Sequence, residues 1–221
     1  MKTLAAAVAA AALAASVAAR AEPPLYETGP AQDSSFVRFL NATGQAATVR
    51  AASGAAVALG TAGAARVSKY YPAIAGKKLE ASVQLGAAKI PAVVVAKPGE
   101  YVTVAVVAKA GGGFETRIVR ESPTDYSAAR VSLSLSNLDA RCAAASMSGG
   151  SQDARIVEGV APFAVGRRQV NPVKLAVRLQ CDGKPAGSVD LSQLEAGERY
   201  SVFLLPLAGP AQALFVRDAT S

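Results

Sequence analysis

The chain has 221 residues, 51% of them hydrophobic and 5% aromatic, with a formal net charge of +7 and neither histidine nor tryptophan. An apolar fraction of this size predicts a globular protein, and the lysines and arginines are too scattered to form the basic, aromatic-interleaved surface that binds nucleic acid. The lack of histidine excludes Ser-His-Asp and Cys-His catalysis, histidine general bases and the usual zinc sites.

The N-terminal segment is typical of an export signal. Lys2 precedes an uncharged, alanine-rich run from residue 3 to residue 19, and Ala19-Arg20-Ala21 supplies small residues around a cleavage site. This order predicts a cleaved signal peptide over 1–21, because the apolar run is too short and too weakly apolar to span a bilayer. A retained anchor is the alternative. Cleavage would leave the rest of the chain in the bacterial periplasm.

Short segments with β-strand character follow the predicted signal. FVRFLN from Phe36, KLEASVQL from Lys78 and YVTVAVV from Tyr101 alternate or are rich in β-branched residues, and turn-forming residues bound each of them. The alanine-rich stretches between them are interrupted by glycines, so we expect no long amphipathic helix. Glycines 111–113 lie between two predicted strands and indicate a hairpin loop.

The second half of the chain repeats the first about 96 to 98 residues later. Asn41, at the end of FVRFLN, aligns with Asn137, at the end of VSLSLSN. The KL pair at Lys78 matches the one at Lys174, and the Gly-Glu pair before YVTVAVV matches the pair before RYSVFLL. RIVRE, ending at Glu121, matches LFVRD, ending at Asp218. Four matches in one order at a nearly constant offset indicate two copies of one domain.

These observations predict an all-β protein with two tandem β-sandwich domains related by an internal repeat, after a cleaved signal peptide. The expected divisions are the signal peptide 1–21, a first sandwich 22–121, a linker 122–129 and a second sandwich 130–221. In the strand from Val131, the alternating serines at 132, 134 and 136 predict the outward row of a half-buried antiparallel strand.

Cys142 and Cys181 are the two cysteines of the chain. Two cysteines in an exported protein favour a disulfide, and closing a loop of this length stabilises by about 4 kcal/mol in the chain-entropy model. A redox-active pair is the alternative, but the CxxC spacing is missing. The pair is expected to join either the two sheets of the second sandwich or two adjacent strands.

We predict no catalytic, cofactor-binding or metal-ligating residues. The sequence lacks a G-x-S-x-G elbow, a P-loop and a dinucleotide-binding glycine motif in the required context. The carboxylates that could form a pair for glycoside chemistry lie in turn-like contexts, at Asp182, Asp190, Glu195 and Glu198. A binding or scaffolding protein is therefore expected rather than an enzyme.

Two places have the residue types of a contact surface. Tyr70 and Tyr71, followed by Lys77 and Lys78, could stack on a sugar or meet a partner, although a packed pair at a strand end is the alternative. Arg167 and Arg168 form the densest cationic turn of the second half and could meet an acidic patch, with a solvated loop as the alternative.

The segment LYETGPAQDSSFVRFLNA, residues 25 to 42, resembles the start of the mature AlgF proteins of bacterial alginate O-acetylation. VNPVKLAVRL from Val170, followed by the Asp182-Gly183 turn, is a second similar block. The resemblance implies an exported accessory protein with two β-sandwich domains, no cofactor and no recognised catalytic residue. The two cysteines and the alanine-rich first half depart from the family pattern.

The resemblance further implies a non-catalytic periplasmic adaptor at the inner membrane, required for O-acetylation of a secreted polysaccharide such as alginate or cellulose. Its implied partners are a membrane-bound O-acyltransferase and a periplasmic SGNH-type acetyltransferase, and the polysaccharide is a further candidate ligand. Two alternatives are a fimbrial-type chaperone with two sandwich domains and a sugar O-acetyltransferase. Pro91 and Pro98 interrupt the long edge strand that a chaperone would donate.

Overall fold

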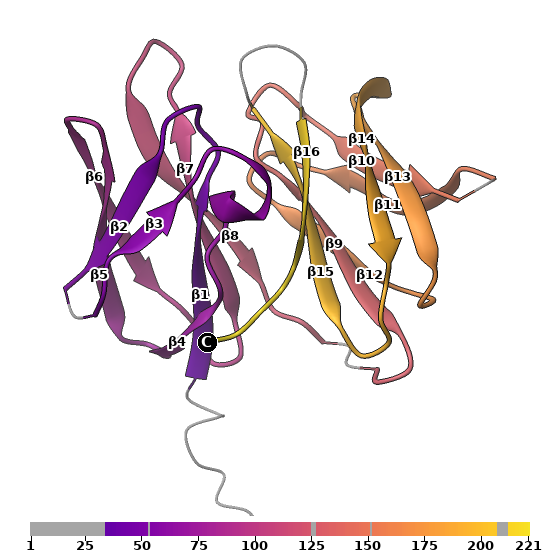
Figure 1. The fold of residues 1–221 in the computed structure, drawn as a ribbon, viewed down its shortest axis with the longest axis horizontal. Coiled ribbons are helices and arrows are strands. Elements are labelled where there is room, and N and C mark those ends of the chain that lie inside the picture. The colour runs from indigo at the N-terminus through magenta and orange to yellow at the C-terminus, as the bar shows by residue number, and fades with distance from the viewer. Residues whose placement is uncertain (1–33, 53, 125–126, 151, 207–211) are drawn as a thin grey trace, which may run out of the picture.

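The computed structural model describes residues 34–52, 54–124, 127–150, 152–206 and 212–221 (Figure 1). The predicted signal peptide 1–21 and the beginning of the AlgF-like leader lie outside the described residues. In the described ranges the regular elements are strands, apart from one short 3-10 helix, η1 (Gly63–Arg66). No described helix has the length and apolar character needed to cross a bilayer.

Domain one, which contains β1 to β8, is a sandwich of two four-stranded sheets. Its inner sheet has the order β4-β1-β7-β8, formed by β1 (Ser34–Asn41), β4 (Tyr71–Ile74), β7 (Tyr101–Ala108) and β8 (Phe114–Glu121). Its outer sheet has the order β3-β2-β5-β6, formed by β2 (Ala47–Ala51), β3 (Val57–Leu59), β5 (Lys78–Leu85) and β6 (Ala88–Val95). Glycines 111–113, all at positive φ, form the predicted β7–β8 turn.

Domain two, which contains β9 to β16, has the same arrangement. Its inner sheet has the order β12-β9-β15-β16, formed by β9 (Val131–Asn137), β12 (Val165–Val170), β15 (Arg199–Leu205) and β16 (Gln212–Arg217). Its outer sheet has the order β11-β10-β13-β14, formed by β10 (Ala145–Gly149), β11 (Ala154–Val160), β13 (Lys174–Cys181) and β14 (Lys184–Gln193). The identical strand orders confirm the all-β class and the internal repeat.

The two asparagines used to align the repeat have the same structural role. The Asn41 side-chain amide donates to the carbonyls of Gln45 (2.7 Å) and Gly60 (2.9 Å). The Asn137 amide donates to the carbonyls of Cys142 (2.8 Å) and Val160 (3.0 Å). Each asparagine therefore ties the end of an inner-sheet strand to the following loop and to the end of the terminal outer-sheet strand, β3 or β11, and satisfies backbone groups that would otherwise be buried without a partner.

The prediction of an outward, solvent-facing serine row on β9 was wrong. Ser132, Ser134 and Ser136 are buried, and β9 pairs with β15 in parallel, as β1 pairs with β7. The second face of each inner sheet packs against the other domain instead of facing water. This contact contains a third hydrophobic cluster of residues from both domains, with Phe203 fully buried between them.

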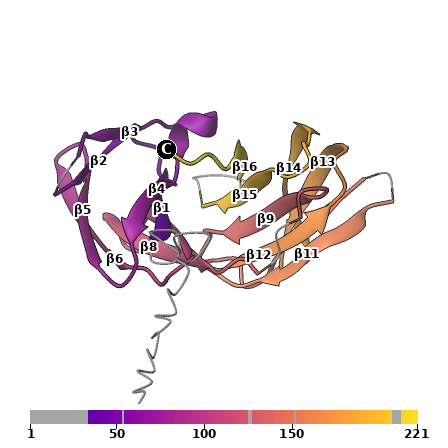
Figure 2. The same ribbon diagram turned by 90° about the horizontal axis from the view of Figure 1, so that it is seen from below.

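The last residues of the chain strengthen this contact. After β16 the chain crosses to domain one and runs beside the segment that leads into β4 (Figure 2). The Tyr70 N–H donates to the Ala219 carbonyl at 2.7 Å, and the Ser221 N–H donates to the Tyr70 carbonyl at 2.9 Å. Backbone bonds thus join the domains in addition to side-chain packing.

Close packing between β11 and β12 depends on Gly166. A Cβ atom there would lie 2.5 Å from Val157 Cγ1 and 3.2 Å from Val160 Cγ2. We expect Gly166→Ala to lower the free energy of unfolding by about 1–3 kcal/mol, because the core would be overpacked. Gly44→Ala is the control, since a Cβ atom at Gly44 has no neighbour within 4 Å. Urea titrations of both variants test this, and equal effects would contradict it.

Candidate functional site

Domain one has a groove of about 730 Å³ at one side of its sandwich. We call it the domain-one groove. Val37 and Phe39 of β1 and Val49 of β2 form its floor. Gly54, Ala55 and Ala56, which precede β3, line one wall, and β4 with the start of β5 forms the other. The groove therefore lies where the terminal strands of the two sheets, β3 and β4, leave the core uncovered.

The corresponding position in domain two is closed. There the terminal strands are β11 and β12, which pack against each other at Gly166. β11 has 7 residues, whereas its counterpart β3 has 3. A short terminal strand covers less of the sandwich interior, so the opening is a property of domain one and not of the repeated fold.

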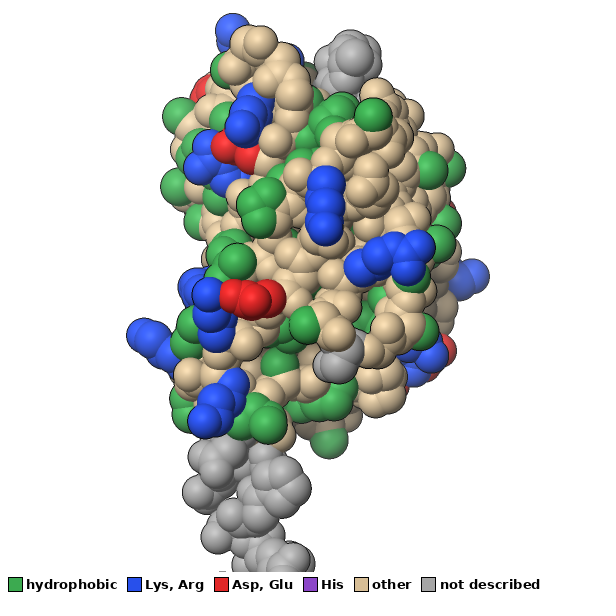
Figure 3. All heavy atoms as spheres, turned by 90° about the vertical axis from the view of Figure 1, so that its left-hand side faces the viewer, with side chains coloured by type: hydrophobic (Ala, Val, Ile, Leu, Met, Phe, Trp, Pro, Cys, Tyr) green, Lys and Arg blue, Asp and Glu red, His purple; other side chains and the backbone are tan. Residues whose placement is uncertain are grey.

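The domain-one groove brings together three of the residues predicted from the sequence. Tyr71 is half-buried in the wall, and Lys77 and Lys78 are exposed at the rim. Lys78 forms an exposed ion pair with Glu80, which contributes little to stability because water screens it. Figure 3 views the domain-one end of the molecule and shows basic side chains spread singly over it, without a continuous basic stripe.

Tyr70 is not part of this surface, although the sequence placed it with Tyr71. Its side chain is 2% exposed, and its ring packs edge-on against Tyr101 at 5.1 Å. The Arg38 guanidinium lies 4.4 Å from the ring centre on the side of the domain contact. The expected contact with a sugar or a partner is therefore wrong for Tyr70, because adjacent strand residues point to opposite faces of a sheet.

Burial raises the pKa of Tyr70 to about 12, while the nearby Arg38 charge acts in the opposite direction. We expect the difference in phenolate absorbance between the wild type and a Tyr70→Phe variant to titrate near pH 12. An exposed tyrosine titrates near pH 10. A pH titration of both proteins measures the difference, and a midpoint near pH 10 would show that Tyr70 is accessible.

Arg167 and Arg168 are neighbours in β12, so their side chains point to opposite faces of the sheet. Arg167 is 13% exposed in its side chain and forms a two-bond ion pair with Glu121 of domain one. It is thus committed to the contact between the domains, in contrast to the predicted partner-facing turn. Arg168 is exposed at a cleft of about 300 Å³ beside Arg120 and Gln169, and its contact with a partner stays a prediction.

The domain contact contains a cluster of buried charges of which the sequence pointed only to Arg167 as a candidate contact residue. We call this cluster the interface network; it consists of Arg38, Glu121, Arg167, Arg199 and Asp218. Asp218 pairs with Arg38 at 2.7 Å and with Arg167 at 3.4 Å, and Glu121 also pairs with Arg199 at 3.5 Å. Thr103 and Ser201 accept hydrogen bonds from Arg38, each at 2.9 Å.

The interface network resembles a catalytic arrangement only in its residue types. The Ser201 hydroxyl donates to Asp218 at 2.7 Å, but Ser201 is fully buried between two sheets. A nucleophile must reach its substrate, and this hydroxyl cannot. The network is suited to holding two domains in one orientation.

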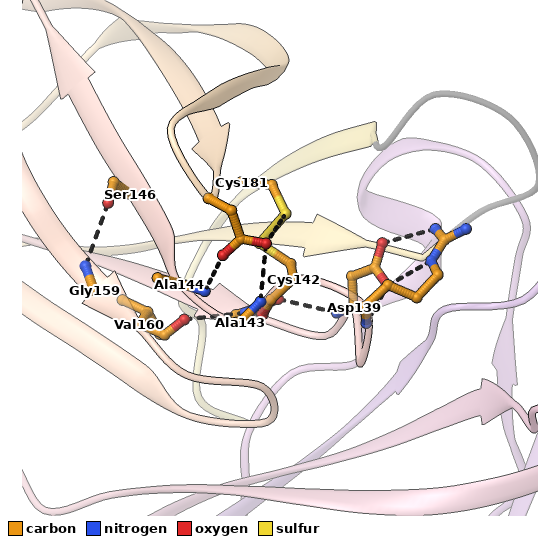
Figure 4. Close-up of a disulfide and its surroundings, with 11 residues drawn as sticks. Asp139, Cys142, Ala143, Ala144, Ser146, Gly159, Val160 and Cys181 are labelled. Atoms are coloured by element: carbon orange, nitrogen blue, oxygen red, sulfur yellow. Dashed lines mark hydrogen bonds and ion pairs between the residues drawn. A yellow bond between two sulfur atoms is a disulfide. The ribbon is translucent and has the colours of Figure 1, made fainter.

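The predicted disulfide is present between Cys142 and Cys181, whose Cα atoms are 5.4 Å apart (Figure 4). It connects the loop after β9 of the inner sheet with the end of β13 in the outer sheet. The Asp182 carboxylate reinforces this loop by accepting from the Ala144 N–H at 2.8 Å. Asp182 and the two sulfur atoms lie close together, but sulfur atoms in a disulfide are not thiolate ligands.

The chain matches the family described as "Alginate O-acetyl transferase AlgF" over residues 6–201. No curated protein matches it. Among solved structures it is similar to the module CBMbc (family CBM26) of Eubacterium rectale Amy13K in complex with maltoheptaose, at 7% identity and a TM-score of 0.27 over 85% of this chain and 98% of that one. A candidate cell adhesion protein from Bacteroides ovatus matches at 6% identity and a TM-score of 0.28, over 84% and 98%. Neither similarity is large enough to assign a ligand.

Proposed function

The chain belongs to the AlgF family, which has a role in alginate O-acetylation, and we propose on that premise that it is a non-catalytic adaptor for this reaction. In this role it joins a membrane-bound O-acyltransferase to a periplasmic SGNH-type acetyltransferase. The acceptor is a secreted polysaccharide, either alginate or cellulose, and the adaptor works in the periplasm at the inner membrane.

The residue types of the chain support the non-catalytic part of the proposal. Acetyl transfer through the protein would need a nucleophile beside a base, and the chain has no histidine. Its two cysteines form a disulfide. The serine that donates to a buried aspartate, Ser201, is inaccessible.

The adaptor part of the proposal is supported by the different outer surfaces of the two domains, which the domain contact holds in one orientation. Each domain uses its inner sheet for the domain contact, so the outer surfaces stay available for other proteins. The domain-one groove has no open counterpart at the equivalent position of domain two. An adaptor with two different partners needs such an asymmetry, since identical repeats would bind the same partner twice.

Deletion of the gene tests the proposed role. We expect a polysaccharide that is still secreted but has lost its acetyl groups, measured by NMR of the polymer together with its total yield. Complementation with the full gene should restore acetylation. Unchanged acetyl content would contradict the proposal, and loss of the polymer itself would indicate a role in synthesis or export instead.

A chromogenic acetyl ester separates an adaptor from an enzyme. Purified protein is expected to release no more chromophore than the same buffer, and mass spectrometry should find no acetylated residue. A burst of chromophore with a matching mass increase would instead identify a covalent acetyl carrier.

A further inference from the structure

The domain-one groove is bordered by the backbone of two terminal strands. β4 is the last strand of the inner sheet and pairs only with β1 among the described strands, and β3 is the last strand of the outer sheet and pairs only with β2. Terminal strands present backbone donors and acceptors that can pair with another extended chain. The groove thus combines an apolar floor with strand edges.

The chain itself shows that this edge accepts an extended segment. Ala219 and Ser221 bond to both backbone groups of Tyr70, in a parallel bridge between Thr220 and Tyr70. Tyr70 directly precedes β4, so the tail is bound on the edge that continues along β4. From Tyr71 to Ile74 no described strand occupies that edge. Pro72 supplies a carbonyl there but no N–H, and the Ile74 carbonyl already accepts from the Lys77 N–H, so this short edge offers few backbone bonds and the side-chain contacts of the groove must supply much of the affinity.

The side chains around the groove indicate what such a segment would carry. Ile74 is 67% exposed at the rim and offers an apolar contact beside the floor of the groove. The groove is lined by Lys77, Lys78 and a single carboxylate, Glu80, which is paired with Lys78. Apolar side chains would therefore fit the floor, and a carboxylate would complement Lys77 at the rim.

We propose that the domain-one groove binds an extended peptide segment of a partner protein, with apolar side chains facing the floor and an acidic residue beside Lys77 and Lys78. This inference rests on the proposed adaptor function, because it identifies the kind of surface by which one partner is held. Addition of a strand to a sheet edge is a general mode of peptide recognition, in which backbone bonds supply affinity and side-chain pockets supply specificity.

The groove fits a peptide better than the other ligand classes. A sugar chain would lose the hydration of its hydroxyl groups over a floor of Val37, Phe39 and Val49, which offers no side-chain hydrogen bonds in return. An acyl chain would fit the floor but could not use the backbone groups of β3 and β4. Only a peptide satisfies both the floor and the edges.

A phage-displayed library of random twelve-residue peptides is the probe, selected on the purified protein from residue 22 to residue 221. We expect the enriched peptides to alternate apolar and polar residues and to contain an acidic residue. In NMR titrations the shifts should be confined to residues of the domain-one groove. Ala55→Trp, on the exposed loop of the wall, should abolish binding by filling the groove.

Charge reversal adds a matched pair of variants. Lys77→Glu with Lys78→Glu should weaken binding about tenfold, a difference of about 1.4 kcal/mol, and changing the acidic residue of the peptide to lysine should restore it. The control is Lys174→Glu with Lys184→Glu, which changes the net charge equally on exposed residues of domain two. Lys174 is the repeat counterpart of Lys78.

Several outcomes would overturn the inference. Peptides that bind Ala55→Trp as well as the wild type would bind elsewhere, and a library without groove-dependent peptides would exclude peptide recognition. An oligouronate or fatty-acid micelles could instead change the NMR chemical shifts of the groove residues while the selected peptides do not. That result would identify another ligand class. The peptide assays use purified protein, whereas the deletion measures acetylation in the host. Failure of peptide binding would therefore leave the proposed role in acetylation intact if the deletion still abolishes acetylation. Peptide binding could likewise be observed even if the deletion left acetylation unchanged.

Discussion

Asp218→Ala is expected to lower the free energy of unfolding by about 3–5 kcal/mol, the range for removing one partner of a buried ion pair. Asp218 is 3% exposed in its side chain and lies 2.7 Å from both the Arg38 guanidinium and the Ser201 hydroxyl. Without this carboxylate, Arg38 would stay buried without its ion-pair partner, and Arg167 would keep only its pair with Glu121. Urea unfolding followed by circular dichroism measures the loss.

Two further variants separate the charge effect from simple loss of packing. Glu158→Ala breaks the exposed pair with Arg155 and should cost less than about 1 kcal/mol. The double variant Arg38→Leu with Asp218→Leu removes both charges and should be more stable than Asp218→Ala alone, because apolar replacement of a buried pair is often close to neutral. A double variant that is less stable than Asp218→Ala would contradict the electrostatic explanation.

The Asp218 carboxylate also makes the stability of the protein depend on pH. Burial alone would raise the pKa of Asp218, but Arg38, Arg167 and the Ser201 hydroxyl outweigh it and hold the pKa below its usual value. Its contribution to stability is therefore present above the unfolded-state pKa of about 3.9 and is lost as the pH falls through the lower folded-state value. The free energy of unfolding of the Asp218→Ala variant should therefore fall less than that of the wild type as the pH is lowered, when both are measured by urea unfolding.

Removing the disulfide is expected to have an effect of similar size. Cys142 and Cys181 are 39 residues apart in sequence, and the chain-entropy model gives about 4 kcal/mol for closing a loop of that length. A Cys142→Ala and Cys181→Ala double variant should show this decrease in urea unfolding, and reductant should destabilise the wild type but not the variant. A variant with the stability of the wild type would contradict the prediction.

The position of the disulfide also predicts which part of the double variant is destabilised first. Both cysteines belong to domain two, and domain one has no counterpart to them. Amide exchange in the variant should therefore rise first in β10 and β13, next to the lost bond, while β5 and β6 of domain one keep their protection. Equal loss of protection in both domains would show that they unfold as one unit.

Sequence reasoning recovered most of the fold but only part of the site. Asn41 and Asn137 were aligned correctly, and they make equivalent hydrogen bonds. Tyr71, Lys77 and Lys78 do line one groove, whereas Tyr70 and Arg167 belong to the domain contact. Strand alternation separates Tyr70 from Tyr71 and Arg167 from Arg168, so applying it to those pairs would have shown that both members cannot face one ligand.

The interface network had a weak signal in the sequence. The repeat aligned Glu121 with Asp218, and both carboxylates accept from arginines across the contact. Nothing in the sequence showed that they are buried, because their partners come from the other domain: Glu121 pairs with Arg167, and Asp218 with Arg38.

The amino-acid sequence by itself determined the strand composition, the internal repeat, the missing histidine and the pair of cysteines, because alternation and turn residues act over a few neighbouring positions. Only the tertiary structure decided what the polar row of each inner sheet contacts. A period-two pattern distinguishes the two faces of a strand but does not show whether the polar face meets water or another polar sheet. Ser132, Ser134 and Arg38 are therefore buried by contact between the two domains, through residues that lie far apart in the sequence.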